Sequence, residues 1–298
     1  MEEKISIVLA TYNGEKFLRE QLNSILNQSI QFYELIITDD ASTDGTCEII
    51  SEYASKDDRI KVLKSSCNSG LVRNFEKGLA AASGDLIAFS DQDDIWLPDH
   101  LEVLKSNIGD NAVCMGDSEI IDELGNRSNI TLSYCENRDY IPEDSLEKAY
   151  SIFFYRGWLQ GASMLIRKSI LKDALPFPDI NNYHDFWIGA LACFNGGIRY
   201  VPHVITLYRR HSGAVTGMKE RHSYIRTMIG HVLFSRALCD RPLLVKALKE
   251  RLNTSLSKEN ILFLDKAEVF YKRRNTVIGR FRNFFFELNH RKLIYSRK

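Results

Sequence analysis

Four short apolar runs in the first ninety residues constrain the fold of this chain more than any other feature. They lie at residues 5–9, 34–38, 60–63 and 86–89. Between them, apolar residues recur every three or four positions, which is the period of an amphipathic helix. Strands that alternate with such helices are joined by right-handed crossovers in a mostly parallel sheet. The sequence therefore predicts an α/β fold, an αβα sandwich around a mostly parallel central sheet.

The pattern becomes less regular after residue 99, and helices dominate the last third of the chain. An N-R-S-N turn at 126–129 marks a polar insertion. In chain order we expect a helix at 101–104, a strand at 112–115, a polar insertion at 120–150, a strand at 162–166, a helix at 186–194, a strand at 204–208 and helices within 220–298.

Polar residues follow three of the four amino-terminal strands at the point where each strand ends. They are T-Y-N at 11–13, D-D at 39–40 and D-Q-D-D at 91–94. The carboxyl ends of parallel strands meet at one edge of the sheet, where ligands bind. Carboxylates there suit Mg²⁺ or Mn²⁺, which carry phosphate oxygens with them. Alone, the acidic run is equally explained by a polar turn in which Asp94 or Asp99 caps the next helix, but the three groups together favour a nucleotide and cation site.

The composition is that of an ordinary globular protein with unevenly distributed charge. The 298 residues are 44% hydrophobic and 26% charged, with a formal net charge of zero, and they can bury a sizeable core. Residues 1–100 carry 18 acidic and 9 basic side chains, whereas residues 266–298 carry 10 basic and 2 acidic ones. This asymmetry suits a cation-binding amino-terminal part and a tail that meets an anionic surface.

Cysteine usage and hydropathy indicate where the protein works. The six cysteines show no C-x-x-C spacing, and no apolar leader precedes Lys4. We therefore expect reduced thiols in a cytoplasmic protein, not a disulfide framework or a zinc site. The sequence has no run of about 18 apolar residues, so we expect no membrane-spanning helix. The basic tail has no accompanying nucleic-acid motif, and we expect no nucleic-acid partner.

Five motifs together give the chain a specific resemblance to a known family. They are I-S-I-V-L-A-T-Y-N at 5–13, T-D-D-A-S-T-D-G-T at 38–46, N-S-G-L-V-R-N at 68–74, A-A-S-G-D-L-I-A-F-S-D-Q-D-D at 81–94 and H-D-F-W at 184–187. From about residue 5 to about residue 217, the chain resembles the family 2 glycosyltransferases. These are inverting, nucleotide-sugar-dependent enzymes of the GT-A fold.

Three details refine the resemblance. The S-D-Q-D-D-I-W-L-P run at 90–98 and Y-R-R-H at 208–211 are most similar to bacterial rhamnosyltransferase-type members. Ala10 stands where many members have proline, a difference that should alter little beyond the stiffness of the turn. The Q-x-x-R-W signature of processive polysaccharide synthases is absent from the sequence. The resemblance therefore implies transfer of one sugar per encounter.

The family's metal-binding D-x-D corresponds to Asp91 and Asp93. The resemblance implies that Asp93 binds the Mg²⁺ or Mn²⁺ ion that bridges the donor diphosphate, and that Asp91 lies towards the ribose. Asp94 either assists through water or caps the helix ahead. His211 would reach the metal or the diphosphate, as a C-terminal histidine does in some GT-A enzymes, and Arg209 could act likewise. A lone histidine also has many other uses.

The resemblance places the donor nucleotide on the first two strand ends. Tyr12 would lie against the base, with Thr11 and Asn13 lining that turn. Asp40 would accept a hydrogen bond from the ring N–H of uracil or thymine, because a carboxylate is only an acceptor. Arg73 matches a position that contacts phosphate or base. Without the resemblance, a surface ion pair would be its default interpretation.

On the acceptor side, the resemblance assigns the general base to Asp185 in the H-D-F-W motif. An inverting transfer needs a base on the face opposite the leaving group. The alternative is that Asp185 merely begins a helix. Trp158 and Trp187 could stack on sugar rings, although tryptophan is more often a core residue. Gln160 and Gly161 match a region that borders the acceptor in relatives.

The tail carries an apolar stripe, since Phe281, Phe284, Phe285 and Leu288 fall at i, i+3, i+4 and i+7. The basic residues nearby are Arg280, Arg282, Arg291 and Lys292. A basic helix with an aromatic face can lie in the interface of an anionic membrane. The alternative is a helix packed on the catalytic domain with solvated arginines. We expect peripheral membrane contact through residues 266–298.

These expectations combine into one hypothesis. Residues 1–217 would form a GT-A domain, with its nucleotide-binding half at about 1–100 and its acceptor half at about 101–217, and residues 218–298 a basic helical extension. A metal-dependent inverting glycosyltransferase would move one sugar, such as rhamnose or another deoxyhexose, from a dTDP- or UDP-sugar. The acceptor would be a cell-surface polysaccharide or its lipid-linked precursor, and the enzyme would work at the cytoplasmic face of the membrane.

Two alternatives remain. A sugar-phosphate nucleotidyltransferase would normally have a glycine-rich basic loop after the first strand, which residues 11–15 do not supply. A noncatalytic nucleotide-sugar binding protein could keep the same fold. The presence of Asp91, Asp93 and Asp185 together argues against that second alternative.

Overall fold

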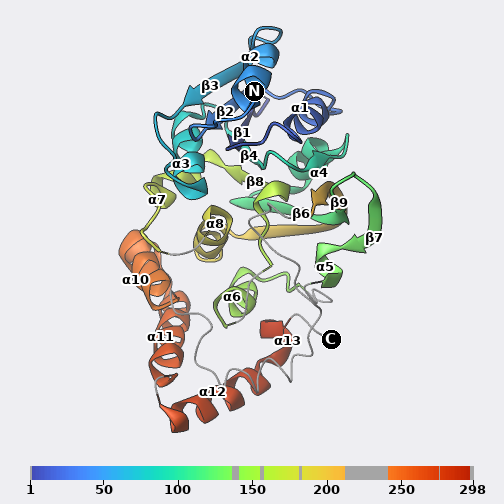
Figure 1. The fold of residues 1–298 in the computed structure, drawn as a ribbon. Helices are drawn as coiled ribbons and strands as arrows, with labels where there is room; N and C mark the ends of the chain where they lie inside the picture. Colours follow the sequence, from blue (N-terminus) through green and yellow to red (C-terminus); the bar gives the residue numbers. More distant parts are fainter. Residues whose placement is uncertain are drawn as a thin grey trace.

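The computed structural model describes residues 2–135, 141–154, 158–180, 183–211, 241–274 and 276–295. A nine-stranded sheet runs through the molecule in the order β3-β2-β1-β4-β8-β6-β9-β5, with β7 paired to β6. Figure 1 shows the amino-terminal strands and helices at one end of the molecule and the last helices, α10 to α13, at the other. The predicted αβα architecture is confirmed.

The amino-terminal half of the sheet is parallel, as its apolar runs predict. Strand β1 pairs with β2 on one side and with β4 on the other, and β2 pairs with β3, all in parallel. Every residue of β1, β2 and β4 is buried, which explains their nearly continuous apolar sequence. The strands are β1 (Ile5–Thr11), β2 (Glu34–Asp39), β3 (Ile60–Lys64) and β4 (Leu86–Ser90).

Helices cover both faces of this parallel half, because side chains alternate across each strand. Ile7 and Leu9 of β1 belong to one core cluster with Leu22 of the first helix. Val8 of β1 belongs to a second cluster with Phe75 of the third helix. The covering helices are α1 (Leu18–Leu26), α2 (Thr46–Ala54) and α3 (Leu71–Ala81).

The second half of the sheet is mixed in direction. Strand β8 (Met164–Arg167) is antiparallel to both β4 and β6 (Val113–Ile121), whereas β9 (Ile198–Arg209) is parallel to β6. Strand β9 is longer than the expected 204–208, and the predicted insertion contains β7 (Arg127–Thr131). The other elements of this half are α5 (Leu132–Cys135), α6 (Ser145–Phe154), α7 (Leu171–Ala174) and α8 (His184–Ala192).

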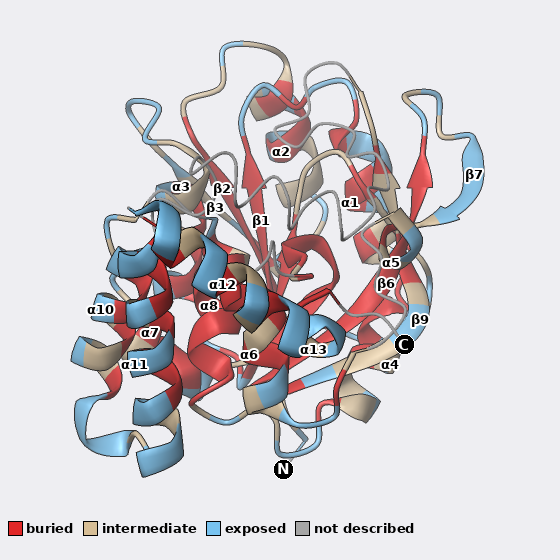
Figure 2. Cartoon of the chain, turned by 90° about the horizontal axis from the view of Figure 1, so that it is seen from below, coloured by how far each residue is buried: buried red, intermediate tan, exposed pale blue. Residues whose placement is uncertain are grey.

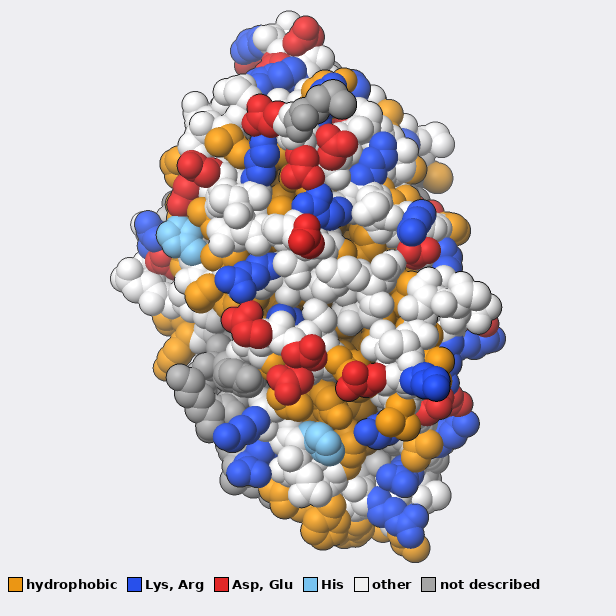
Figure 3. Space-filling model, turned by 180° about the vertical axis from the view of Figure 1, so that it is seen from behind, with side chains coloured by type: hydrophobic (Ala, Val, Ile, Leu, Met, Phe, Trp, Pro, Cys, Tyr) orange, Lys and Arg blue, Asp and Glu red, His pale blue; other side chains and the backbone are white. Residues whose placement is uncertain are grey.

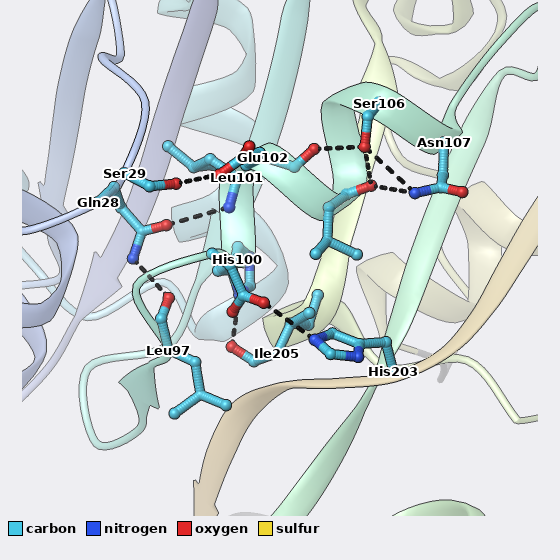
Figure 4. A network of polar contacts seen from close by, with 12 residues as sticks. Gln28, Ser29, Leu97, His100, Leu101, Glu102, Ser106, Asn107, His203 and Ile205 are labelled. Carbon is cyan, nitrogen blue, oxygen red and sulfur yellow. Dashed lines mark hydrogen bonds and ion pairs between the residues drawn. The ribbon is translucent and has the colours of Figure 1, made fainter.

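Helix α4 (His100–Asn107) joins the two halves. Gln28, just after α1, donates to the carbonyl oxygen of Leu97 at 2.8 Å and accepts from the backbone N–H of Leu101 at 3.0 Å (Figure 4). The ring of His100 lies 3.1 Å from the carbonyl oxygen of Ile205 in β9. Hydrogen bonds to Gln28 and to β9 therefore fix α4, and the short strand β5 (Ile95–Trp96) before it pairs with β9.

The carboxyl-terminal helices share the core of the sheet. Leu244 of α10 and Phe263 of α11 belong to the same buried cluster as Phe89 of β4. Tyr271 in α11 also donates a hydrogen bond of 2.6 Å to the backbone of α6. These helices are α10 (Arg241–Leu252), α11 (Lys258–Arg273), α12 (Val277–Asn289) and α13 (Arg291–Tyr295).

The proposed domain boundary at residues 217 and 218 lies outside the described residues.

Figure 2 shows buried central strands and outer helices whose outward faces are exposed. No helix in the described parts of the chain is both long and apolar enough to cross a membrane.

Candidate active site

The carboxyl ends of β1, β2 and β4 meet at one edge of the sheet, as the strand pattern predicts. Thr11 lies beside Asp39 in the parallel register of β1 and β2, and Leu9 lies beside Ser90 of β4. The three polar groups at 11–13, 39–40 and 91–94 therefore project from adjacent strands. A ligand at this edge can touch all of them.

The turn after β1 is built around a left-handed residue. Asn13 has a φ of +48°, a conformation that asparagine tolerates better than most residues. Its backbone N–H donates to Ser42 Oγ at 2.9 Å, and its side chain accepts from the backbone N–H of Thr43 at 2.8 Å. Asn13 thus joins the turn after β1 to the turn after β2, and this leaves Tyr12 exposed at the rim.

Gln92, the central residue of the D-x-D motif, clamps that same turn. Its Oε1 accepts from the backbone N–H of Tyr12 at 2.8 Å, and its Nε2 donates to the carbonyl oxygen of Tyr12 at 3.0 Å. A Cβ on Gly14 would lie 2.2 Å from Gln92 Oε1, so a larger residue there would force Gln92 to shift away from this clamp. This role of Gln92 could not be predicted, because nothing in a sequence pattern reports a contact across 80 residues.

The two aspartates after β2 hold neighbouring loops. Asp39 is buried and accepts hydrogen bonds from Thr11 Oγ1 at 3.1 Å and from the backbone N–H of Ser42 at 2.9 Å. Asp40, also buried, accepts from the backbone N–H and hydroxyl groups of Ser69 and from the N–H of Gly70 at 2.7–3.0 Å. A base contact for Asp40 stays a prediction.

The acidic run after β4 concentrates negative charge in a dry environment. Burial, then the charges of Asp93 and Asp185, raise the pKa of Asp91 to about 8. Burial, then the charges of Asp93 and Asp91, raise the pKa of Asp94 well above its usual range. Asp94 Oδ2 is buried and has no hydrogen-bond partner among the described residues. Nothing in this part of the protein compensates these charges fully, which is typical of a functional site.

The helix-cap alternative is wrong for Asp94, whereas Asp99 does occupy the N-cap position of α4. Asp94 immediately precedes strand β5, and its Oδ1 accepts from the backbone N–H of Arg209 at 3.0 Å. Asp99 stands at the start of α4, but its side chain makes no capping hydrogen bond to that helix. It faces His203 instead, with 2.9 Å between Asp99 Oδ2 and His203 Nε2.

The end of β9 brings His211 to the acidic run. His211 Nε2 lies 2.8 Å from Asp93 Oδ2, across 118 residues of sequence. The guanidinium group of Arg209 is buried and bonded within the fold, because its Nε donates to the carbonyl oxygen of Asp93 at 2.8 Å and its Nη2 pairs with Glu20. Arg209 therefore supports the backbone of the acidic run, which is a structural role.

Asp185 reaches the same space from α8. Its charge is among the causes that raise the pKa of Asp91, after burial and the charge of Asp93, so the two carboxyl groups lie near each other. Asp185 Oδ2 accepts from the backbone N–H of Gly161 at 3.0 Å, and its Oδ1 from the N–H of Phe186 at 2.6 Å. The structure thus joins Gly161 and Asp185, two residues that the resemblance assigns to the acceptor side.

Two buried side chains near Asp185, those of His184 and Gln160, have nitrogen atoms without a hydrogen-bond partner among the described residues. Both ring nitrogens of His184 are unpaired among the described residues, and the ring packs 3.9 Å from Phe75 between centroids. Burial lowers the pKa of His184 to about 3, so this ring is neutral at working pH. Gln160 accepts from Ser118 Oγ at 3.0 Å, but its Nε2 donates to no described atom. A buried donor without a partner is costly unless a ligand supplies the acceptor.

The two tryptophans and Arg73, for which we predicted contacts with the substrate, make other contacts in the structure. Trp158 and Trp187 are each 2% exposed and belong to the hydrophobic core, so neither ring face is available to a sugar. The stacking hypothesis for both is wrong, and the core alternative is observed. Arg73 forms the surface ion pair that was its default interpretation, with 2.8 Å to Glu76. A phosphate contact for Arg73 stays a prediction.

The donor set at this edge fits a hard divalent cation. Its side chains offer carboxyl oxygens at Asp91 and Asp93 and an imidazole at His211, which lies 2.8 Å from Asp93. Among the described residues, no three His, Cys, Asp or Glu side chains converge into a ready-made metal site. Mg²⁺ is usually held by one or two carboxylates together with waters and substrate phosphates. This arrangement would complete its coordination with a diphosphate.

Comparison with known proteins gives a consistent result. The family model described as Glycosyl transferase family 2 matches residues 6–174. The putative glycosyltransferase EpsH of Bacillus subtilis (strain 168) is 31% identical over 222 residues, which are 71% of this chain and 62% of EpsH. The match thus spans less than two thirds of that relative.

Solved structures share the fold at low sequence identity. S. aureus TarS 1–349 in complex with UDP-GlcNAc has a TM-score of 0.57 at 18% identity, over 98% of this chain and 91% of that one. The mannosyltransferase PcManGT from Pyrobaculum calidifontis, in complex with GDP-Man and Mn²⁺, has a TM-score of 0.54 at 15% identity, over 96% and 88%. These likenesses confirm the GT-A fold.

Proposed function

The chain belongs to glycosyl transferase family 2, and on that premise we propose that it moves one sugar from a nucleoside-diphosphate donor to a glycan hydroxyl with inversion at the anomeric carbon. One observation carries the proposal. Asp185 comes from a segment distant in sequence from Asp91 and Asp93, and burial, then the charges of Asp93 and Asp185, raise the pKa of Asp91 to about 8. Such mutual repulsion is retained where a cation and a proton have to be bound.

Asp185 is the proposed general base. It takes the proton from the attacking hydroxyl group as the new bond to the anomeric carbon forms, and the bond to the donor phosphate breaks on the opposite face of the sugar. The electron pair leaves with the nucleoside diphosphate. The N–H groups of Gly161 and Phe186 hold the carboxylate of Asp185 at 3.0 and 2.6 Å, which fixes its orientation. The unpaired Nε2 of Gln160 would donate to an acceptor oxygen nearby.

Asp93, with His211 2.8 Å away, is the proposed holder of a Mg²⁺ or Mn²⁺ ion, and Asp91 would face the ribose. When bound, the cation would neutralise the charge that develops on the departing diphosphate. Occupation of the site would also relieve the repulsion between Asp91, Asp93 and Asp185. The Mn²⁺ in the PcManGT complex supports this assignment by likeness of fold.

The proposed donor is a UDP- or dTDP-sugar. Tyr12 is exposed at the rim, where its ring can meet a base, and Thr11 and Asn13 shape the turn beneath it. Asp40 and Arg73 are the further donor contacts that we propose. TarS was solved with UDP-GlcNAc, which supports a uridine donor. The resemblance of the 90–98 run to rhamnosyltransferase-type members favours rhamnose or another deoxyhexose.

The proposed acceptor is a cell-surface polysaccharide or its lipid-linked precursor. EpsH is described only as a putative glycosyltransferase and gives no acceptor. A lipid-linked acceptor is presented at a bilayer surface, so we propose that the enzyme works at the cytoplasmic face of the membrane. The basic segment 266–298 is the part that would contact that surface.

Donor turnover tests the proposal. The purified full chain should release UDP or dTDP from one member of a nucleotide-sugar panel when Mn²⁺ or Mg²⁺ is present, and chelation should stop it. The same donor should raise the melting temperature only with the metal, because a ligand that binds the folded state stabilises it. Asp185→Asn should bind the donor normally and lose transfer by about 10³-fold.

A matched control is Asp173→Asn, since Asp173 also lies in the first turn of a helix, but in α7, where it accepts a hydrogen bond from Asn195 at 2.8 Å. This variant should turn over normally. If Asp185→Asn transferred sugar at the normal rate, Asp185 would not be the base. If no nucleotide sugar were turned over or bound under any metal condition, the chain would be a noncatalytic member of its family.

A further inference from the structure

Helix α12 buries polar side chains and exposes apolar ones, the reverse of an ordinary surface helix. Gly279, Asn283 and Glu287, spaced four residues apart, are its buried residues. Asn283 Nδ2 donates to the carbonyl oxygen of Phe270 at 2.7 Å, and Glu287 accepts from the hydroxyl group of Tyr295. A surface helix of a soluble domain normally buries its apolar stripe and exposes its polar one. In α12, polar side chains make much of the inward contact.

The apolar residues of α12 point outwards. Phe281 and Phe285 are 53% and 60% exposed, and Ile278 is 71% exposed. Val277 and Leu288 complete this outward set, which we call the α12 face. Phe284, which the sequence pattern places in the same stripe, is half-buried and packs against the core. Gathered exposed apolar residues of this kind mark an interaction surface.

The α12 face is held rigidly on the domain. Phe286, on the other side of the helix, packs 4.9 Å from Phe154 of α6 between ring centroids. Ile294 and Tyr295 of α13 are buried in the same core. Figure 1 places α12 at the end of the molecule remote from the amino-terminal strands. The face is therefore preformed and needs no rearrangement before it meets a partner.

The exposed charges that α12 and its neighbours in sequence carry have one sign, although Lys272 pairs with Glu268 of α11 at 2.7 Å. Within the described part of 272–295, every exposed charged side chain is basic, and the single acidic residue, Glu287, is buried. Figure 3 shows hydrophobic side chains gathered at this end of the molecule, with lysine and arginine side chains beside them. The exposed basic residues are Lys272, Arg273, Arg282, Arg291 and Lys292.

The apolar face and its basic border together favour one kind of binding partner. A second copy of this chain would bring like charges together, which opposes self-association. An anionic bilayer offers an apolar region and negative headgroups at once, and a helix with aromatic and basic side chains lies at that boundary. We propose that the α12 face inserts into the headgroup region of an anionic bilayer. The inference deepens the proposed function and rests on it for the placement of the acceptor in that membrane.

Vesicle binding by the full chain tests the inference. The protein should co-sediment with vesicles of phosphatidylcholine containing about 30 mol% phosphatidylglycerol, and weakly or not at all with phosphatidylcholine alone. Rising salt should weaken the binding, because it screens the charges. The double variant Phe281→Ser/Phe285→Ser and the single variant Arg282→Glu should each weaken binding by about tenfold or more.

The matched controls lie away from the face. Leu124→Ser removes a leucine that is 86% exposed, and Lys168→Glu reverses an exposed charge. Both should bind the anionic vesicles as the unaltered chain does. Circular dichroism melting should show that the Phe281→Ser/Phe285→Ser variant is folded, since neither ring is buried.

Three results would overturn the inference. They are a failure of the unaltered chain to bind the anionic vesicles, equal binding by the Phe281→Ser/Phe285→Ser variant, and a concentration-dependent dimer that this variant abolishes, which would make the face a self-interface. Donor turnover without vesicles separates this inference from the proposed function. Vesicle binding without any donor turnover would support the α12 face and contradict only the proposed enzyme activity.

Discussion

Buried carboxyl groups have opposite environments at the two ends of the parallel strands. We call the side of the sheet where these strands begin the amino edge, and the side where they end the carboxyl edge. At the amino edge, Glu34 of β2 accepts from Ser6 Oγ at 2.6 Å and from Lys61 Nζ at 2.5 Å. Burial alone would raise the pKa of Glu34, but these bonds and those from Ser83 outweigh it and lower the pKa to about 2. At the carboxyl edge, burial and neighbouring carboxylates raise the pKa of Asp91 to about 8.

The difference separates a structural carboxylate from functional ones. Glu34 joins β2 to β1, to β3 and to the start of β4, and donors satisfy it within the fold. Asp94 keeps a buried oxygen without a partner among the described residues. A folded protein retains uncompensated carboxylates where a ligand completes them. The carboxyl edge should therefore gain stability from a cation and a donor, and the amino edge should not.

The largest expected effect is on activity at the carboxyl edge. Asp93→Asn removes the carboxylate that faces His211 and should lower transfer by about 10³-fold or more, because charge on the leaving group is no longer neutralised. The metal-free variant should melt at or above the temperature of the unaltered chain, since a repulsive charge has gone. Steady-state kinetics and thermal melting measure the two effects. Near-normal turnover would remove Asp93 from the site.

At the amino edge, Glu34→Gln should destabilise the fold and leave the chemistry unchanged. The expected loss at pH 7 is about 2 kcal/mol, because the ion pair with Lys61 is lost. A carboxyl group with a lowered folded pKa stabilises above its unfolded value, and here that contribution is lost as the pH falls from about 4.5 to 2. Urea unfolding at several pH values measures it.

The control for Glu34 is Glu52→Gln. The pKa of Glu52 is also lowered to about 2, first by Arg19 and then by Lys56, but the side chain of Glu52 is 40% exposed, against 1% for Glu34. Solvent screens such surface pairs, so the unfolding midpoint should barely move. Equal losses for the two variants would mean that burial does not distinguish the amino edge from the surface.

Asp91→Asn should change the free energy of unfolding in the opposite direction to Glu34→Gln. In the absence of metal it should stabilise the fold at pH 7 by about 1–3 kcal/mol, because a carboxyl group that resists ionisation is removed. A folded pKa raised from 3.8 to about 8 means that the unaltered chain loses stability as the pH rises between those values. Mn²⁺ with a nucleoside diphosphate should reverse that slope. A destabilised Asp91→Asn variant would contradict the comparison.

The smallest expected effect is on nucleotide affinity. It concerns one of two glutamines that each bond backbone groups through both the amide oxygen and the amide nitrogen. Gln92 bonds both backbone groups of Tyr12, and Gln28 bonds the backbone of Leu97 and Leu101. Gln92→Ala should weaken nucleoside-diphosphate binding about tenfold with little change in kcat, because it frees the turn under the base. Gln28→Ala should lower the melting temperature and leave binding unchanged. Calorimetry with UDP compares them, and equal affinities would remove Gln92 from the site.

Much of the fold could be predicted from the sequence because burial on both faces leaves a plain signal. The strands β1, β2 and β4 are apolar throughout, and the structure confirms them. Strand β7 has four exposed residues out of five, and β9 is exposed along much of its first half, so neither shows a complete apolar pattern. Their pairing with β6 comes from tertiary context.

The candidate site could be predicted only where chemistry shows in the residue type. Clustered aspartates predict an acidic edge, and the structure brings Asp91 and Asp185 together there. Side-chain direction is not in the pattern, so Trp158 and Trp187 could not be distinguished from stacking platforms. The reversed polarity of α12 was hidden for the same reason, because its apolar spacing is equal whether that face is inside or outside.

The central claim is that the carboxylates of the carboxyl edge hold a cation and a donor diphosphate beside the base. Manganese anomalous scattering from a crystal grown with Mn²⁺ and UDP tests it most directly. We predict a peak within coordination distance of Asp93, with the diphosphate on the same ion and Asp185 facing the space beyond it. A diphosphate bound away from the ends of β1 and β4, or a manganese peak remote from Asp93, would contradict the account.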